Sequence, residues 1–305
     1  MAAQLTFRNV TLGYDRHPAV HHLSGEVAPG ALLAVIGPNG AGKSTTLKLL
    51  TGLLYPSGGC ARVAGFVPWL ERRRLANEIG IVFGQRSQLW YHLRVRDSFG
   101  LLAKIYGLDA RLYRERAERI AGVLRIGGLL DAPVKTLSLG QRMRCEIAAA
   151  LLHGPKVLFL DEPTIGLDVT AKALLREHLK HLAETEDTAI VLTSHDIGDI
   201  EQICARVILV NHGRILLDEP LENLRSSFLR EKRITIVTED ELPEPFGAAL
   251  VVERGPHRLT LSIDASTCAI DEVVAEALKR LRVRDLTIEN APLEEIIRHL
   301  YAEPP

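Results

Sequence analysis

The sequence predicts an α/β fold built on a parallel sheet, joined to a small α+β domain. Three observations predict it. The apolar runs Ala31–Ile36, Lys156–Asp161 and Ala189–Thr193 have the length and composition of strands buried on both faces. Helical patterns separate these runs, and the order strand, helix, strand favours parallel pairing. After about residue 231 the pattern changes to alternating runs and amphipathic helices, which indicates a second domain.

The N-terminal segment is predicted to be antiparallel β structure. Leu5 to Val10 alternates apolar and polar residues, as a half-buried strand does, and Gly13 to Pro18 carries turn residues. The strand Ala31–Ile36 follows, then a glycine-rich loop and a helix over Ser44 to Leu50. This strand, loop and helix begin the α/β core.

A mostly helical insertion is predicted next, over about residues 88–153. Val95 to Leu130 is rich in helix formers and places leucine, isoleucine and valine at helical spacing. The core then returns as strand, helix and strand, and ends in two short strands, Val207–Val210 and Arg214–Leu217, joined by a turn. The apolar stripe predicted for the core helix is Leu174, Leu175, His178, Leu179 and Leu182.

We predict a main domain over residues 1–225 and an accessory α+β domain over residues 226–305, with a linker at about 221–231. The accessory domain shows no catalytic signature. Its helix presents Ile270, Val273, Val274, Ala277, Leu278 and Leu281 on one face. Its other predicted elements are strands at 233–238, 257–263 and 286–288 and a last helix with Leu293, Ile296, Ile297 and Leu300.

Length and composition are those of an ordinary folded protein. The 305 residues are 47% hydrophobic and 25% charged, which excludes a disordered or fibrous chain. The net charge of -1 provides no basic field, so we expect no nucleic-acid partner. The cysteines lack the paired spacing of zinc sites and redox motifs and are interpreted as reduced thiols. They are Cys60, Cys145, Cys204 and Cys268.

No segment of the sequence is typical of export or of membrane insertion. The residues from Met1 to Phe7 lack the basic start and apolar run of a secretory signal. No stretch approaches the ~20 apolar residues that a spanning helix needs. We therefore expect a cytoplasmic protein without direct membrane insertion, whose role at a membrane would depend on a partner.

The glycine-rich loop has the spacing Gly-x-x-x-x-Gly-Lys-Ser of a P-loop, between a strand and a helix as that motif requires. Its glycines let backbone N–H groups surround phosphates, and the following helix adds its N-terminal dipole. Lys43 is placed to reach the β- and γ-phosphates, and the Ser44 hydroxyl to bind Mg²⁺. The predicted nucleotide-binding residues are Gly37, Pro38, Asn39, Gly40, Ala41, Gly42, Lys43, Ser44 and Thr45.

Two consecutive acids follow the strand at 157–160. Asp161 stands at the C-terminal end of this strand, where α/β sheets place ligands, and Glu162 comes next. We assign Asp161 to Mg²⁺ and Glu162 to the role of general base or to positioning of the attacking water. The sequence thus predicts a P-loop NTPase core that hydrolyses a nucleotide.

Four further motifs in the same order carry a family resemblance. Leu137-Ser-Leu-Gly-Gln141 matches a signature loop, and Ile165-Gly-Leu-Asp168 matches a D-loop. Gln85, in Val-Phe-Gly-Gln-Arg, stands at the Q-loop position, and His195, in Leu-Thr-Ser-His-Asp, at the switch position. Over roughly residues 1–225 the sequence resembles the ATPase subunit of an ABC transporter.

The resemblance implies ATP and Mg²⁺ as ligands and a site shared between two copies of the chain. It adds Gln85 to the metal ligands and, with His195 and Lys43, to the catalytic residues. Tyr14 falls where an aromatic ring stacks on adenine. The implied ATP contacts from the other copy are Ser138, Gly140, Gln141 and Asp168.

The signature segment is also interpretable from its residues alone. Ser138 and Gln141 have the spacing of a capping box, which opens a helix whose N–H groups are free to face an anion. An ordinary helix cap explains the same pair. Leu139 stands where the common family form has glycine. We expect Leu139 to be tolerated, because a leucine there would be costly only if its φ were positive.

The resemblance further implies two cassettes that close around two ATP molecules and drive membrane-spanning partner subunits, with the chain peripheral on the inner face of the cell membrane. Trp90 and Tyr91, just beyond Gln85, have two interpretations: exposed aromatics that receive a partner's helix, or ordinary core packing. The cassette and its extra domain resemble those of bacterial exporters. The alternatives are a soluble ABC ATPase that is not coupled to transport, and a GTPase switch, whose Asn-Lys-x-Asp segment the sequence lacks.

Overall fold

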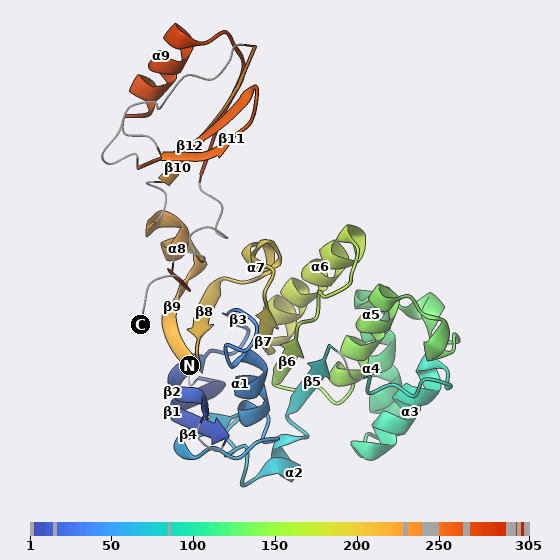
Figure 1. Cartoon of the computed structure of the whole chain (residues 1–305). Coiled ribbons are helices and arrows are strands. Elements are labelled where there is room, and N and C mark those ends of the chain that lie inside the picture. Colours follow the sequence, from blue (N-terminus) through green and yellow to red (C-terminus); the bar gives the residue numbers. More distant parts are fainter. Residues whose placement is uncertain are drawn as a thin grey trace. The chain divides into compact units, whose positions relative to one another are not determined.

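The computed structural model describes residues 3–14, 17–84, 87–227, 231–239, 250–264, 269–290, 297 and 300–301. The chain divides into two compact units, residues 1–219 and 220–305 (Figure 1). The first unit contains the P-loop and every other sequence motif named above.

A six-stranded sheet forms the centre of the first unit. Its order is β5-β6-β7-β3-β8-β9, and the pairs β5/β6, β6/β7, β7/β3 and β3/β8 are parallel, as the sequence predicts. β3 is therefore flanked by two strands that come much later in the chain, which brings their C-terminal ends to the P-loop. The strands are β3 (Leu32–Ile36), β5 (Ile79–Phe83), β6 (Val157–Asp161), β7 (Ala189–Ser194), β8 (Arg206–Asn211) and β9 (Arg214–Pro220).

The N-terminal β structure is a separate antiparallel sheet of order β2-β1-β4. Its strands are β1 (Leu5–Tyr14), β2 (His17–Val27) and β4 (Gly58–Val63). The turn predicted over residues 13–18 is too long, because β1 runs to Tyr14 and β2 begins at His17. Irregular register along β1 explains why the alternation in the sequence stops at Val10.

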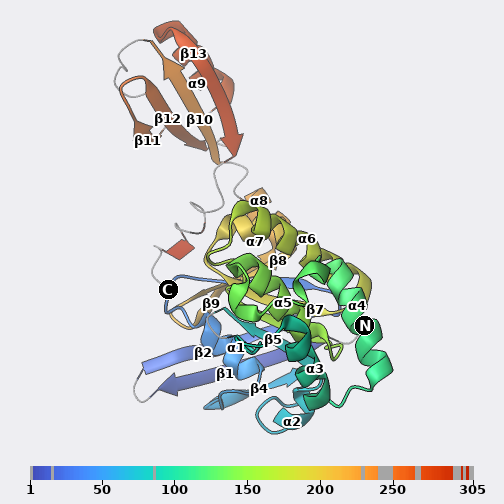
Figure 2. The ribbon, with the colours of Figure 1, turned by 90° about the vertical axis from the view of Figure 1, so that its right-hand side faces the viewer.

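Side-chain alternation gives the central sheet two apolar faces. One face, with Leu33, Val35, Phe159 and Val191, shares a core with the antiparallel sheet and helix α1 (Lys43–Leu50). The intervening side chains, such as Leu160, are also buried and belong to the opposite face. Helices α5 (Leu139–Leu151), α6 (Val169–Glu186) and α7 (Ile197–Ile203) pack against the central strands (Figure 2). A strand buried on both faces needs a continuous apolar run, which is why these strands were predictable.

The predicted helical insertion is present. It consists of α3 (Val95–Ile105), α4 (Ala110–Val123), the short 3₁₀ turns η1 (Gly127–Leu129) and η2 (Val134–Thr136), and α5. A short helix α2 (Arg72–Leu75) precedes β5. The predicted stripe of α6 is buried at Leu175, His178, Leu179 and Leu182. Among the residues that the structure describes, no helix has the length and apolarity needed to cross a membrane.

The second unit holds a four-stranded antiparallel sheet of order β11-β12-β10-β13 and helix α9 (Ile270–Arg280). One face of the sheet buries Ile234, Ile236, Leu259, Leu261 and Ile263 against α9. The strands are β10 (Glu231–Thr238), β11 (Leu250–Arg254), β12 (Arg258–Asp264) and β13 (Val283–Asn290).

Three expectations about the C-terminal segment need correction. The predicted linker contains helix α8 (Leu221–Ser227), which buries Leu221 and Leu224. The edge strand β11 was missed, because all of its side chains are exposed and it shows no alternation. Leu278 was assigned to the buried face of α9 but is 59% exposed. Most of the predicted last helix lies outside the described residues.

Candidate nucleotide-binding and catalytic site

The P-loop joins the end of β3 to an uncapped helix. Gly42, the N-cap of α1, has a φ of 103° and no side chain caps the helix. The first N–H groups of α1 therefore have no capping side chain and are available to an anion. Gly37 is required by close packing, since a Cβ built there would lie 2.3 Å from the carbonyl oxygen of Val210. The fit of this loop to phosphate thus rests on its own backbone.

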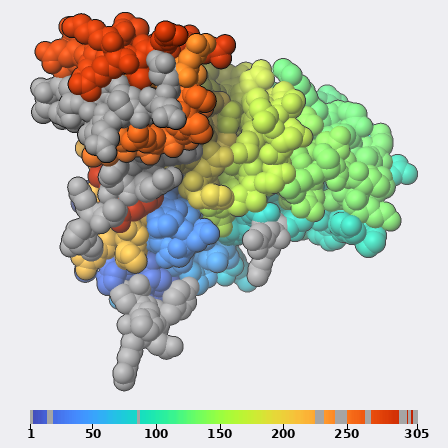
Figure 3. Space-filling view, turned by 45° about the horizontal axis from the view of Figure 1, so that its top comes forward, coloured from blue at the N-terminus to red at the C-terminus, as the bar shows by residue number. Residues whose placement is uncertain are grey.

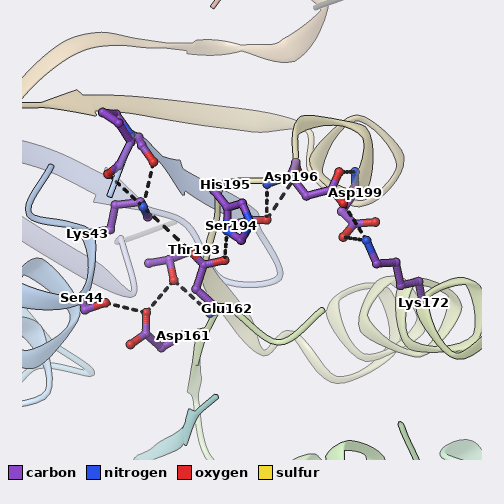
Figure 4. Close-up of polar contacts among 12 residues, drawn as sticks. Lys43, Ser44, Asp161, Glu162, Lys172, Thr193, Ser194, His195, Asp196 and Asp199 are labelled. Atoms are coloured by element: carbon purple, nitrogen blue, oxygen red, sulfur yellow. Dashed lines mark hydrogen bonds and ion pairs between the residues drawn. The ribbon is translucent and has the colours of Figure 1, made fainter. Parts of the chain in front are cut away.

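Lys43 places a buried positive charge inside the loop. Its side chain is 6% exposed, and Nζ donates to the carbonyl oxygens of Gly37 at 2.7 Å and Pro38 at 3.2 Å. The same nitrogen lies 3.7 Å from Oε1 of Glu162 (Figure 4). The predicted phosphate-binding cation and the predicted base therefore share one site, although 119 positions of sequence separate them.

Asp161 and Ser44, the predicted metal ligands, are hydrogen-bonded to each other. Ser44 Oγ donates to Asp161 Oδ1 at 3.0 Å. The buried hydroxyl of Thr193 donates to the same oxygen at 2.7 Å (Figure 4). A carboxylate and a hydroxyl beside a phosphate-binding loop are the hard oxygen donors that Mg²⁺ prefers, so these residues fit that ion.

Glu162 has a backbone conformation that is uncommon for a side-chain-bearing residue. Its φ is 53°, which is typical of catalytic and other over-determined positions. The Glu162 N–H donates to Thr193, to Oγ1 at 3.0 Å and to the carbonyl oxygen at 3.2 Å. Oε2 lies 2.9 Å from Nδ1 of His195, whose side chain is 54% exposed. The carboxylate is thereby held between His195 and Lys43.

The helix that begins in the signature segment has the predicted capping box. Gln141 N donates to Ser138 Oγ at 3.3 Å, and Ser138 N donates to Gln141 Oε1 at 3.0 Å. Ser138 and Leu139 are exposed, and Gly140 is partly so. In Figure 1 helix α5 lies away from α1, with β5 and β6 between them in that view. The described part of the chain thus offers two separate helix N-termini that suit an anion.

Leu139 is accommodated as the first residue of α5. Leu139 is not among the described non-glycine residues that have a positive φ. Its backbone conformation therefore does not require a glycine. Its side chain is 37% exposed and packs against Gly166, where a Cβ would lie 2.6 Å from Leu139 Cδ2. Gly140 meets the next helix in a similar way, because its Cβ would lie 2.8 Å from that of Ala171.

The remaining predicted residues are distributed as follows. Asp168 is the N-cap of α6, and its Oδ1 accepts from Ala171 N at 2.8 Å. Tyr14 ends β1 opposite His17, and its side chain lies outside the described part of the structure. Gln85 lies wholly outside it. The roles assigned to these three residues stay predictions, as do those of the other site residues.

The sequence reasoning missed Thr193, which joins the two acids of the site, and the buried acid Glu146 of α5. Thr193 binds both Asp161 and Glu162, and a hydroxyl at the C-terminal end of a buried strand is the signal that could have found it. Glu146, 4% exposed, accepts from Gln88 N at 3.0 Å and from the Ser87 hydroxyl. Burial raises the pKa of Glu146, against the lowering effect of these hydrogen bonds. A single acid in the apolar run of α5 was the available signal.

Comparison with known proteins assigns the family. Residues 20–165 match the ABC transporter family. The chain is 30% identical to the linearmycin resistance ATP-binding protein LnrL of Bacillus subtilis, over 95% of this chain and 94% of that protein. It is 29% identical to the daunorubicin/doxorubicin resistance ATP-binding protein DrrA of Streptomyces peucetius, over 95% and 90%. It is 36% identical to a Nod factor export ATP-binding protein I of Cupriavidus metallidurans, over 70% of each.

Solved structures agree with these relatives. An ATP-binding subunit of an ABC transporter superposes with a TM-score of 0.67 at 26% identity, over 74% of this chain and 93% of that one. A bacterial ABC transporter cassette solved as a dimer superposes with a TM-score of 0.64 at 26% identity, over 71% and 98%. The fold, the P-loop and these likenesses together show that the chain belongs to the family of ABC transporter ATP-binding subunits, which are ATPases coupled to transport.

Proposed function

We propose that this chain is the ATP-hydrolysing subunit of an exporter, and that two copies close around two ATP molecules to drive membrane-spanning partner subunits. The proposal of export is supported by the relatives, two of which are named for drug or antibiotic resistance and one for Nod factor export. The likeness to a cassette solved as a dimer supports the pairing of two copies.

One observation carries the proposal: a single copy groups five of the predicted site residues at one place and exposes a second candidate anion site, the N-terminus of α5, elsewhere. Lys43, Ser44, Asp161, Glu162 and His195 converge at the ends of β3, β6 and β7 (Figure 4). The capped N-terminus of α5 is exposed at the surface. If the α5 N-terminus of one copy docks at the P-loop of the other, a twofold axis also places the second α5 N-terminus at the first P-loop, because such interfaces are reciprocal.

The residues of one copy take distinct roles. Ser44 and Asp161 would hold Mg²⁺, which neutralises developing charge on the phosphates. Lys43 and the N–H groups of α1 bind the phosphates. Glu162 accepts the proton of the attacking water, and His195 holds the Glu162 carboxylate in place through its Nδ1. Ser138 and Gly140 of the second copy would complete the phosphate site and exclude water from it.

Replacing the base tests this function. We expect Glu162→Gln to lower ATP turnover by about 10²- to 10⁴-fold and to accumulate a dimer with ATP and Mg²⁺ on gel filtration. Glu177→Gln is the matched control, because Glu177 pairs only with the exposed Arg125 among the contacts described. Normal turnover in Glu162→Gln, or a chain that stays monomeric with ATP in both variants, would contradict the proposal.

The helical insertion offers a surface for the membrane partner. Trp90 is 41% and Tyr91 56% exposed, and a pocket of about 640 Å³ opens between α3 and α4. Its lining includes Leu101, Tyr113 and Arg114. In Figure 3 the green atoms of this part of the chain form one continuous region of the surface. Exposed aromatics and a concave, partly apolar surface are both features that suit a short helix of a partner subunit.

The location and the accessory domain follow from this reading. We infer that the chain is peripheral on the inner face of the membrane, since the ATP that it hydrolyses is cytoplasmic. Residues 220–305 form the second unit, and the matches to the two drug-resistance relatives extend into it, because each covers 95% of this chain.

A further inference from the structure

An ion-pair network links the helix after the D-loop to the helix after His195. Lys172, in the first turns of α6, lies 2.6 Å from Asp196 Oδ2 and 2.9 Å from Asp199 Oδ2, measured from its Nζ. Arg176, one turn later, pairs with the other oxygen of Asp199 and with Gln202. Figure 4 shows Lys172 reaching from α6 toward both acids of α7.

The network is partly buried, and its ion pairs favour the charged forms of Lys172 and Asp196. Asp199 is 2% exposed and Lys172 22% exposed. Hydrogen bonding to Asp196, against the effect of burial, raises the pKa of Lys172. Burial acts to raise the pKa of Asp196, but its hydrogen bonds with Lys172 and with the Asp199 backbone outweigh burial and lower that pKa. Both partners are therefore charged near neutral pH.

Asp196 follows His195 directly and is held in place by several hydrogen bonds. It is the N-cap of α7, with Oδ1 accepting from Asp199 N at 3.1 Å. Its own N–H donates to the buried Ser194 hydroxyl at 3.0 Å. His195 lies between Ser194 and Asp196, and Lys172 binds the second Asp196 oxygen. The backbone on both sides of His195 is thus fixed, and the C-terminal side is fixed through Lys172.

The other end of the network reaches the surface where the second copy would bind. Asp168 caps α6, and Lys172 N donates to its carbonyl oxygen at 2.9 Å. Gly140 of α5 contacts Ala171, and Leu139 contacts Gly166. A continuous series of contacts therefore runs from the signature segment through the first turn of α6, Lys172 and Asp196 to His195 and Glu162.

We propose that Lys172 is a positioning residue for ATP hydrolysis: through Asp196 it holds His195 against Glu162. It thereby connects His195 to the surface formed by the α5 N-terminus and the D-loop. This inference rests on the proposed function and deepens it. It explains how docking of the second copy at that surface could position the Glu162 carboxylate in the first copy's site. Among the contacts of the described residues, the Lys172 side chain pairs with Asp196 and Asp199, and neither is assigned to phosphate or metal, so its effect is on turnover and not on ATP binding.

The test compares Lys172→Met with Arg176→Met in the full chain. Both remove a cation of α6 that pairs with buried Asp199, but Lys172 alone also pairs with Asp196. We expect Lys172→Met to lower kcat about 10- to 100-fold with KM for ATP nearly unchanged, as small misplacements of catalytic groups do. Arg176→Met should retain a kcat near that of the wild type, and Lys172→Arg, which keeps the charge, should recover most of the loss.

A double-mutant comparison shows whether Lys172 acts through His195. In a His195→Ala background, Lys172→Met should cause no further loss of kcat. Asp196→Asn, which keeps a capping side chain, should reproduce the loss and serves if Lys172→Met does not fold. Equal losses in Lys172→Met and Arg176→Met, or multiplicative losses with His195→Ala, would overturn the inference alone. Absence of ATP hydrolysis by the wild type would overturn the proposed function and this inference with it.

Discussion

Thr193→Val removes the hydroxyl that ties the two catalytic acids together and changes little else, because valine has nearly the same shape. Thr193 is fully buried in β7. Its hydroxyl donates to the Asp161 carboxylate at 2.7 Å and accepts from Glu162 N at 3.0 Å. Glu162 N keeps a second acceptor in the Thr193 carbonyl oxygen, at 3.2 Å. The net loss is therefore one hydrogen bond to a charged group.

A bond of that kind contributes about 1.5–3 kcal/mol. For a unit of this size, a loss of 1 kcal/mol lowers Tm by about 2–4 °C, so we expect a fall of about 3–12 °C in Tm for the first unit. Thermal unfolding of the nucleotide-free chain, followed by circular dichroism, measures it. Thr188→Val is the matched control, because that buried threonine makes only a 3.4 Å bond to the carbonyl oxygen of Pro155.

The control should lose about 0.5 kcal/mol, at the low end for a neutral hydrogen bond. We also expect Thr193→Val to need more Mg²⁺ for half-maximal ATPase activity, since Asp161 loses the group that orients it. Equal Tm values for Thr193→Val and Thr188→Val would refute the reasoning that Thr193 anchors the acids.

Three further changes test other parts of the account. Leu139→Gly should leave kcat near the wild-type value and lower the free energy of unfolding by about 0.5–1 kcal/mol, as glycine does in helices; a large gain in ATPase rate would contradict the view that leucine is tolerated. Trp90→Glu should abolish recruitment to membranes that contain the partner subunits, whereas Tyr55→Glu, at an aromatic residue that is 62% exposed elsewhere, should not; equal recruitment would refute docking at Trp90. Burial lowers the pKa of His153 and His178 in the folded chain, so the unfolded chain binds protons more readily than the folded chain below about pH 6.5. The free energy of unfolding should therefore fall as pH drops through that value. Denaturant titrations should show a smaller fall for the His153→Gln, His178→Gln double variant.

The elements that the sequence predicted best are those whose pattern is set by burial on both faces. β3, β6 and β7 are continuous apolar runs, and each is followed by its functional residues at the edge where parallel strands end. The P-loop was predictable because phosphate binding demands glycines, a lysine and a hydroxyl at fixed spacing. Local chemistry and fold agree at these positions.

The misses have the opposite cause. β11 is an exposed edge strand and pairs through its backbone alone, so its side chains carry no period. Glu146 and Lys172 pair with residues that are distant in sequence. A lone acid in the apolar run of α5 marked Glu146, but no local pattern identified its partners or those of Lys172. The helix α8 was taken for a linker because seven residues are too few to show helical periodicity clearly.

The central claim is that a working site needs the P-loop of one copy and the α5 N-terminus of another. Two inactive variants test it when mixed. Lys43→Ala disables the P-loop. Ser138→Asp keeps a good N-cap but sets a negative charge against the phosphate, and Ser138→Asn is its neutral control.

In a mixed dimer, the P-loop of the Ser138→Asp chain meets the intact α5 N-terminus of the Lys43→Ala chain, so one of the two sites is complete. Random pairing then predicts recovery of about a quarter of the wild-type ATPase rate. Each variant alone should be inactive at the same total concentration. If mixing Lys43→Ala with Ser138→Asp restores no activity, while each still exchanges into dimers with the wild type, the two-copy site is wrong.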